Sequence, residues 1–218
     1  MIFLSDHERD AVAEAFNLGM GAAGNALSEM LGKEVLLSVP QVNIERSSDA
    51  VKGMLQSARG ELSGVKETFS TNVIAGVREE FDGPFKGSAL LLFPEHRSLE
   101  LVRLLLQQPE ADIDMLTEME QEALVEVGNI ILNACLSAIA EIIGDEILNE
   151  IPEAVKGPIG QIIQEAGCAS EQEFVMKLHM HFEVDEAHID GDIAFIMGIK
   201  SLDVFRAKLA KFFGFGAA

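Results

Sequence analysis

A carboxylate and an amide recur at the same helical spacing in two parts of the chain. Residues at i, i+4 and i+7 lie on one narrow face of a helix. Two sets have this spacing, namely Asp10, Glu14 and Asn17, and then Glu122, Glu126 and Asn129. Neither Glu nor Asn is a good nucleophile, but an amide both donates and accepts hydrogen bonds, and a carboxylate pairs with cations. These residue types therefore indicate a site that orients a water molecule and docks a positive group.

Each stripe is followed at a fixed distance by a proline. The pattern Glu-x2-Asn-x22-Pro ends at Pro40 after the first stripe and at Pro152 after the second, and Asn133 extends the second stripe. A solvated edge of an amphipathic helix is the simplest interpretation of one such stripe. Two stripes in register favour a functional origin, although a duplication can also copy a purely structural feature.

The surrounding sequence repeats together with the stripes. Gly32 is matched by Gly144, and further on Gly87-Ser88-Ala89-Leu90 is matched by Gly191-Asp192-Ile193-Ala194, so the second copy is shorter in its middle. Units of this size are too long for a solenoid. We therefore predict one domain over residues 1–218, in which duplicated halves at about 5–107 and 115–213 are related by a pseudo-two-fold axis.

Each half is predicted to contain the same elements in the same order: a long helix, a strand, a short helix, a hairpin and a closing helix. The ranges in the first half are 5–32, with a bend at Gly19–Gly21, then 35–44, 48–57, 70–79, 85–92 and 95–107. Those in the second half are 116–144, 147–154, 159–165, 173–184, 190–197 and 201–213. Residues 80–83 are predicted to join the first hairpin, and the acidic stretch 108–114 to link the halves. This order predicts an α+β fold in which long helices are layered on an antiparallel sheet.

The doubled motif resembles a known signature. Asp or Ser, x3, Glu, x2, Asn, x22, Pro is the pattern of the CheC/CheX/FliY family of chemotaxis phosphatases. The first copy fits it at every position, and the second has Glu122 in place of the usual Asp or Ser. Two copies in one chain resemble the CheC branch of the family, and the resemblance spans essentially the whole chain.

The resemblance implies that the protein dephosphorylates the response regulator CheY. In that family the Asn orients the attacking water beside the aspartyl phosphate, and the Glu contacts a lysine of the regulator. Carried over to this chain, the catalytic residues are Glu14, Asn17, Glu126 and Asn129, and the supporting residues are Asp10, Glu122, Pro40 and Pro152. The resemblance also implies that the chain has no cofactor or metal of its own, that Mg2+ is carried by the phosphorylated regulator, and that the receptor deamidase CheD is a second partner.

Two other interpretations of the stripes stay open. A non-catalytic adaptor would use the same faces to bind CheY or CheD without hydrolysis. A purely structural duplication would leave both stripes as solvated surface and would bind no regulator.

Composition excludes several other classes of protein. The 36 Asp and Glu outnumber the 16 Lys and Arg, which gives a formal net charge of -20. Nucleic acid and anionic membranes would therefore be repelled. Polar residues interrupt the most apolar run, 123–143, so we expect no membrane span, and the two cysteines, Cys135 and Cys168, are expected to be reduced thiols of a cytoplasmic protein.

His179 and His181 alternate on a predicted strand and are a weaker candidate site. Two imidazoles on one face of a strand can bind a metal together, but a metal site needs at least a third ligand. With no third ligand nearby in the sequence, strand surface or core is the favoured interpretation.

Overall fold

The computed structural model describes residues 5–60, 73–106, 118–167, 173–184 and 187–214. Its helices are α1 (Asp6–Leu31), α2 (Ser47–Gly60), α3 (Glu95–Leu105), α4 (Glu118–Ile143), α5 (Ile159–Glu165) and α6 (Ile199–Phe212). Its strands are β1 (Val35–Arg46), β2 (Val73–Asp82), β3 (Gly87–Pro94), β4 (Leu148–Asn149), β5 (Glu153–Pro158), β6 (Glu173–Val184) and β7 (Ala187–Gly198).

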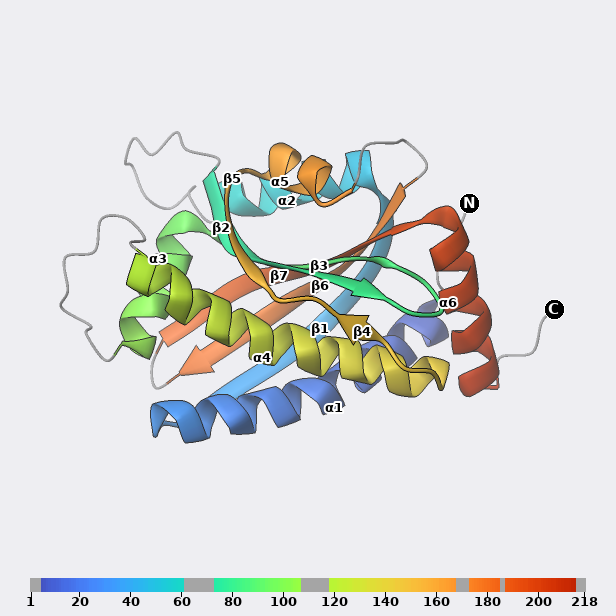
Figure 1. Ribbon diagram of the computed structural model, residues 1–218, viewed down its shortest axis with the longest axis horizontal. Helices are drawn as coiled ribbons and strands as arrows, with labels where there is room; N and C mark the ends of the chain where they lie inside the picture. The colour runs from blue at the N-terminus through green and yellow to red at the C-terminus, as the bar shows by residue number, and fades with distance from the viewer. Residues whose placement is uncertain (1–4, 61–72, 107–117, 168–172, 185–186, 215–218) are drawn as a thin grey trace.

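The strands form one antiparallel sheet with helices on both of its faces. Its order is β1-β6-β7-β3-β2-β4, and β5 also pairs with β2. The long helices α1 and α4 lie side by side across one face and run in opposite directions (Figure 1). Part of the other face is covered by α2 and α5, which enclose a smaller apolar cluster. The predicted α+β fold is confirmed.

The sheet order is unchanged when the two halves of the chain are exchanged. β7 and β3 are neighbours at the centre, β6 and β2 flank them, and β1 and β5 pair on the outer sides. Such an order is what a duplicated domain would produce, but the pseudo-two-fold axis and the boundaries of the halves stay predictions. The predicted linker and Cys168 lie outside the described residues.

The first long helix is continuous, so the predicted bend at Gly19–Gly21 is wrong. The Ser5 side chain caps its first turn in a capping box with Glu8, and Gly32 ends it in the left-handed conformation. A Cβ on Gly19 would lie 2.8 Å from the carbonyl oxygen of Ala134 on α4. Gly19 therefore serves the close approach of α1 to α4 rather than a break in the helix.

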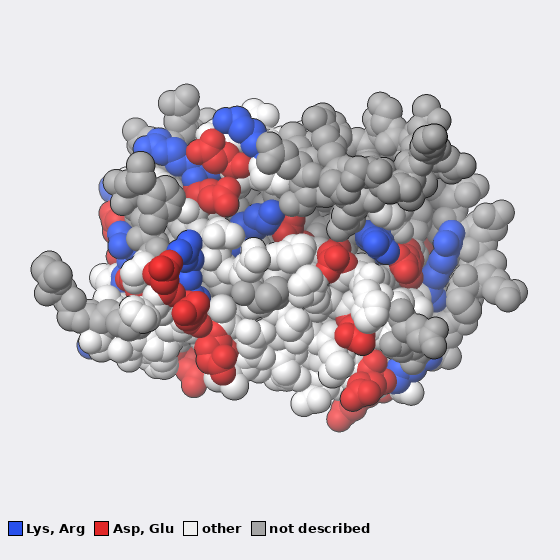
Figure 2. Space-filling view, turned by 180° about the vertical axis from the view of Figure 1, so that it is seen from behind, with Lys and Arg blue, Asp and Glu red and all other residues white. Residues whose placement is uncertain are grey.

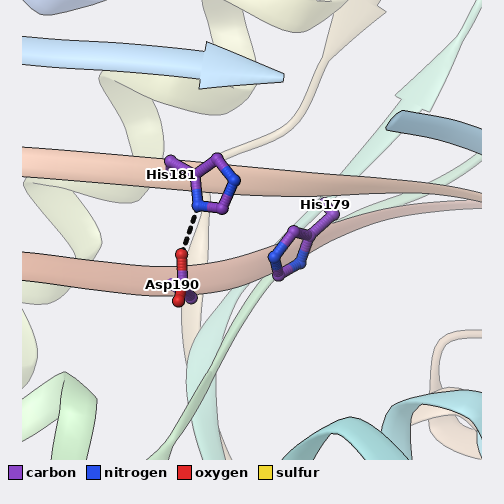
Figure 3. A group of neighbouring side chains, drawn as sticks. All are labelled: His179, His181 and Asp190. Atoms are coloured by element: carbon purple, nitrogen blue, oxygen red, sulfur yellow. Dashed lines mark hydrogen bonds and ion pairs between the residues drawn. The ribbon is translucent and has the colours of Figure 1, made fainter. Parts of the chain in front are cut away.

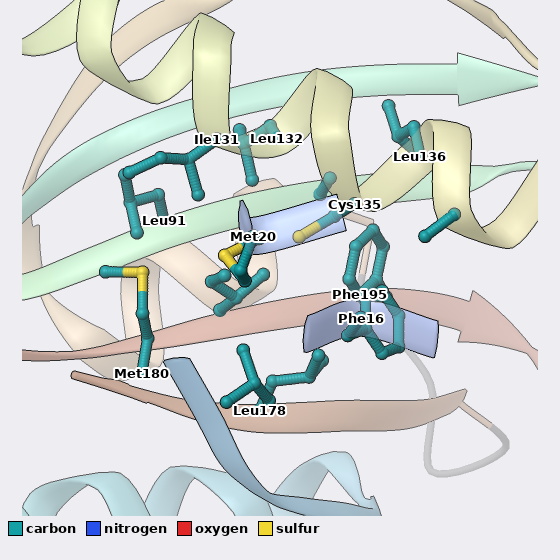
Figure 4. Close-up of a cluster of buried hydrophobic side chains, with 14 of the residues drawn as sticks. Phe16, Met20, Leu91, Ile131, Leu132, Cys135, Leu136, Leu178, Met180 and Phe195 are labelled. Atoms are coloured by element: carbon teal, nitrogen blue, oxygen red, sulfur yellow. The ribbon is translucent and has the colours of Figure 1, made fainter. Parts of the chain in front are cut away.

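The main apolar core lies between the sheet and the α1–α4 pair (Figure 4). Phe16 of α1 is fully buried and stacks on Phe195 of β7, with ring centroids 5.8 Å apart. Cys135 is buried in the same cluster, and this burial raises the pKa of its thiol. Within the described residues, α4 is the one helix long and apolar enough to cross a membrane, but half of its apolar window is buried inside the protein. It therefore has the character of a core helix.

Each motif proline lies where a strand has one residue more than its partner. In β1, Val39 and Pro40 stand opposite a single residue of β6, because Ser38 pairs with His181 and Gln41 with His179. Such an extra residue is a β-bulge. Proline, which has no N–H group, is tolerated there and on edge strands.

The second proline has a larger effect on its strand. Asn149 pairs with Phe81 and Glu153 with Arg78, so residues 150–152 stand opposite two residues of β2. The predicted continuous strand 147–154 is therefore wrong, because pairing stops at these residues and resumes at β5. The predicted turn 80–83 is also misplaced, since β2 continues to Asp82 and pairs with β4 there.

Candidate functional site

The predicted stripes lie on the two helices that cross the sheet side by side. On α1, Asp10 and Glu14 are exposed and Asn17 is half-buried. On α4, Glu122 and Glu126 are exposed and Asn129 is half-buried. In both helices the carboxylates therefore point to solvent, while the amide one turn later sits where the helix meets its neighbours.

The two stripes are well separated along the helix pair. The helices run in opposite directions and touch where Gly19 meets Ala134. Glu14 precedes that contact on α1 and Glu126 precedes it on α4, so at 1.5 Å per residue they are displaced by about 20 Å along the axes. This arrangement gives two separate surfaces rather than one joint site.

In the first stripe, the amide of Asn17 is bonded to the main chain of the bulge in β1. Its Nδ2 donates to the carbonyl oxygen of Val39 at 3.2 Å, and its Oδ1 accepts from the Val39 N–H at 2.8 Å. Val39 is fully buried and directly precedes Pro40. Asn17 and Val39 are 22 positions apart in the sequence, and Pro40 is the next residue. This hydrogen-bonded contact therefore explains the fixed spacing between Asn and Pro in the first copy.

These two hydrogen bonds use half of the hydrogen-bonding capacity of the Asn17 side chain. An Asn side chain has two N–H donors and two acceptor lone pairs, of which the Val39 contact takes one each. One donor and one lone pair remain. The amide is therefore fixed in orientation and still able to hold one water molecule.

In the second stripe, Asn129 is held by side chains. Its Oδ1 accepts from Asn133 Nδ2 at 2.6 Å, and Asn133 Oδ1 accepts in turn from Asn149 Nδ2 at 2.7 Å. Asn149 also donates to Glu79 of β2. We call this chain of hydrogen bonds the relay; its members are Asn129, Asn133, Asn149 and Glu79. The relay fixes the Oδ1 side of Asn129, and the Nδ2 of Asn129 takes no part in it.

Glu79, at the end of the relay, is a buried carboxylate. It is 1% exposed, and within the described residues its Oε2 has no hydrogen-bond partner. Burial raises its pKa, and the hydrogen bond from Asn149 opposes that rise. Sequence reasoning did not identify Glu79 or Asn149, because they lie on β2 and β4 and meet α4 only through the tertiary fold.

The surroundings of the two stripes also differ in their exposed apolar side chains. Leu18, next to Asn17, is 72% exposed, and Ile151, next to Pro152, is 92% exposed. Single exposed apolar side chains are common on soluble proteins, so these two residues do not by themselves mark a binding surface. Asn149 also lines an open cleft of about 760 Å³ between the ends of β2, β3 and β7.

Comparison with known sequences finds similarity to the CheC-like family. A model of the CheC-like family matches residues 8–44, the segment that holds the first motif from Asp10 to Pro40. The CheY-P phosphatase CheC of Bacillus subtilis (strain 168) is 23% identical over 164 residues, which cover 74% of this chain and 72% of the relative. The predicted resemblance to the CheC-like family is confirmed.

Solved structures with the same fold include FliY and FliM. FliY of Thermotoga maritima has a TM-score of 0.70 at 18% identity and covers 97% of this chain and 100% of its own. FliM from the FliM-SpeE complex of H. pylori has a TM-score of 0.67 at 8% identity, with coverage of 95% and 97%. These likenesses extend over almost the whole chain, so the fold belongs to the chain as a whole and not only to the matched motif segment.

Proposed function

We propose that the chain is a phosphatase of chemotaxis signalling that hydrolyses the aspartyl phosphate of a CheY-type response regulator. The observation that carries the proposal is the pair formed by Glu14 and Asn17, in which an exposed carboxylate lies one turn from an amide held by the main chain. The pair lies in the segment that matches the CheC-like family, and the B. subtilis relative is named a CheY-P phosphatase.

The proposed mechanism depends on positioning. Hydrolysis of an acyl phosphate needs a water in line with the phosphorus and compensation of charge, and it needs little covalent chemistry from the enzyme. The free donor and lone pair of Asn17 would orient that water, and Glu14 would dock against a lysine of the regulator. Glu126 and Asn129 would act in the same way on α4, and the Mg2+ would come with the phosphorylated regulator.

The two-surface arrangement supports one regulator at each stripe. A displacement of about 20 Å between Glu14 and Glu126 along the helix axes means that one small regulator domain engages one stripe at a time. The exposed Leu18, next to Asn17, and the exposed Ile151, next to Pro152, would each offer an apolar contact to a regulator. We further propose a cytoplasmic location, where such regulators act, and CheD as a second partner without assigned contact residues.

The second candidate function is a non-catalytic adaptor on the same fold. It is favoured by the FliM structures, which share the fold and were solved as FliM-SpeE and FliG-FliM complexes. In this alternative, the stripes would bind a regulator or CheD and release no phosphate.

Phosphate release from CheY phosphorylated by a small phosphodonor in Mg2+ tests the proposal. We expect the wild-type chain to accelerate release and the double variant Asn17→Ala/Asn129→Ala to have lost that acceleration. Glu14→Gln with Glu126→Gln should weaken it without affecting the fold, because both side chains are exposed. Asn25→Ala, an exposed Asn on α1, is the matched control and should keep full activity.

A pull-down with phosphorylated CheY, run beside this assay, separates the alternatives. Retention of the regulator without phosphate release would favour the adaptor. Absence of both retention and release would leave the stripes as solvated surface. Unchanged release by a folded double Asn variant would show that the amides are not catalytic.

A further inference from the structure

One face of the β6–β7 hairpin carries a group of side chains able to bind a metal ion. His179 and His181 alternate with buried core residues of β6, so both imidazoles lie on the face opposite α1 and α4. The register pairs His181 with Asp190 and His179 with Asp192. Residues directly opposite one another in an antiparallel pair present their side chains on the same face. The hairpin therefore brings two imidazoles and two carboxylates together.

Three of these groups already lie close to the geometry of a metal site. One ligand atom each of His179, His181 and Asp190 lies within 4.8 Å of the other two (Figure 3). The imidazole centroids are 4.9 Å apart, and His181 Nδ1 is hydrogen-bonded to Asp190. Ligand atoms around tetrahedral zinc are about 3.3 Å apart, given bonds of roughly 2.0–2.1 Å. Small side-chain rotations are enough to close the remaining gap.

Asp192 fixes the orientation of His179. Its Oδ1 lies 3.2 Å from His179 Nδ1, and its Oδ2 lies 3.3 Å from Lys177 Nζ. Both Asp192 and Lys177 are nearly buried, with side chains 14% and 13% exposed. Metal-bound histidines usually donate their second ring N–H to a carboxylate in this way. With Nδ1 directed at Asp192, the Nε2 lone pair of His179 is available to a cation.

We propose that His179, His181 and Asp190 form a binding site for a divalent transition-metal ion of the zinc type, with Asp192 as a positioning residue. Imidazole and carboxylate donors together suit such ions better than Ca2+ or Mg2+, which prefer oxygen ligands alone. A cation between His181 and Asp190 would take the place of the hydrogen bond between them, and a neutral His181 would then carry its N–H proton on the other ring nitrogen. His181 and Asp190 side chains are 50% and 37% exposed, which leaves a coordination position open to water.

The proposal is independent of the proposed phosphatase activity. The cluster lies on the sheet face away from the helices that carry the stripes. Figure 2 shows the molecule from behind relative to Figure 1, and acidic and basic side chains are interspersed on that side.

Zinc binding by the tag-free, chelator-treated full chain tests the site, measured by competition with a chromophoric chelator at pH 8. This pH is chosen because the hydrogen bond with Asp192 raises the pKa of His179, and a proton competes with the metal at lower pH. We expect one equivalent to bind. His179→Gln and His181→Gln should each weaken binding at least about 10-fold, and Asp192→Asn by about 10-fold, as for other residues that orient ligands.

His188→Gln is the matched control. His188 is on the same hairpin, its side chain is 71% exposed, and it lies 3.7 Å from Glu183, but it is not part of the cluster. This variant should bind zinc like the wild type. Zinc should also raise the melting temperature of the wild type and of His188→Gln, but not that of His179→Gln/His181→Gln.

Three outcomes would overturn the proposal. They are the absence of stoichiometric zinc binding, an equal loss of affinity in His188→Gln, and unchanged affinity in a folded His179→Gln/His181→Gln variant. Far-UV circular dichroism without metal establishes that each variant is folded. Co2+ added in place of Zn2+ should give visible absorption bands, which the double variant should lack.

Discussion

Asn17 is held by the main chain of a neighbouring strand, whereas Asn129 is held by the side chain of Asn133. Both amides occupy the same position in the repeated motif, and both prolines stand where a strand has one extra residue. In the first half the residue before the proline, Val39, is fully buried and bonded to the amide. In the second half its counterpart, Ile151, is 92% exposed.

The difference shows what the repeated spacing specifies. The x22 spacing places a bulge after each helix, but it does not decide whether the bulge turns its main chain toward the amide. Where Ile151 turns outward, Asn133 and Asn149 supply the missing partners. A main-chain anchor moves only with its strand, while a relay of side chains can rearrange by changes of rotamer.

The largest expected effect concerns stability. Asn17→Ala should lower the free energy of unfolding by about 2–3 kcal/mol, because it removes two hydrogen bonds to the buried main chain of Val39. Asn129→Ala should cost about 1 kcal/mol, the value of one hydrogen bond. Urea denaturation of both variants measures the difference, with exposed Glu14→Ala as a control near zero. Equal losses for the two Asn variants would mean that the two anchors are equivalent.

At Glu79, the last residue of the relay, we expect a substitution to raise the free energy of unfolding rather than lower it. Burial raises the pKa of Glu79 in the folded protein. The folded protein is therefore more stable when Glu79 is protonated, and this extra stability is lost as the pH rises through the folded pKa. Glu79→Gln should therefore stabilise the protein by about 1 kcal/mol at pH 8, because it removes a buried charge with an unsatisfied oxygen.

This gain should shrink as the pH is lowered from 8 to 5, because burial raises the pKa of Glu79 and its carboxyl therefore takes up a proton at a higher pH than an exposed Glu does. Denaturation curves at the two pH values provide the measurement, and the exposed Glu126→Gln on α4 serves as the control. A gain that is independent of pH would show that the charge of Glu79 is not the cause.

Asn17 and Asn129 should contribute unequally to the proposed phosphatase activity. If the stripes acted equally and independently, either single Asn variant would lose about half of the rate. We expect Asn17→Ala to lose more than half and Asn129→Ala less, since Asn17 belongs to the complete motif and is oriented by the rigid main chain. Rates of phosphate release, measured below the melting temperature of each variant, test this expectation. A larger loss in Asn129→Ala would mean that the second stripe contributes more than the first.

The smallest expected effect is that of salt on regulator binding. The net charge of -20 should repel a regulator whose phosphorylation pocket is acidic. Screening over about 10 Å at 0.1 M salt should then leave the affinity unchanged or raise it modestly. Titrations in both single Asn variants should give the same salt slope, because the charge acts on both stripes. A steep loss of affinity with added salt would mean that the global charge attracts the partner.

Much of the local structure follows directly from sequence pattern. The glycine that ends each long helix and the apolar periodicity along α1 and α4 are local signals, and they predicted these helices well; the capping box at Ser5 was found in the structure. The same periodicity placed the carboxylates of both stripes on exposed faces. The bend at Gly19 was predicted wrongly because a glycine that weakens a helix is locally indistinguishable from one that admits a neighbouring helix.

The partners of the candidate sites depend on contacts far apart in the chain. Val39 of β1 bonds Asn17 of α1, Asn149 of β4 bonds Asn133 of α4, and Asp190 meets His181 only through the register of β6 with β7. A shift of one residue in that register would move Asp190 to the other face of the sheet.

The sequence by itself determined the helix faces, the doubled spacing and the excess of negative charge, because these depend on residue order and composition alone. The tertiary structure decided which atoms hold each amide, that Glu79 is buried, and that Asp190 lies beside His179 and His181. Such contacts depend on strand pairing and on helix packing, which bring together residues that have no fixed relation along the chain.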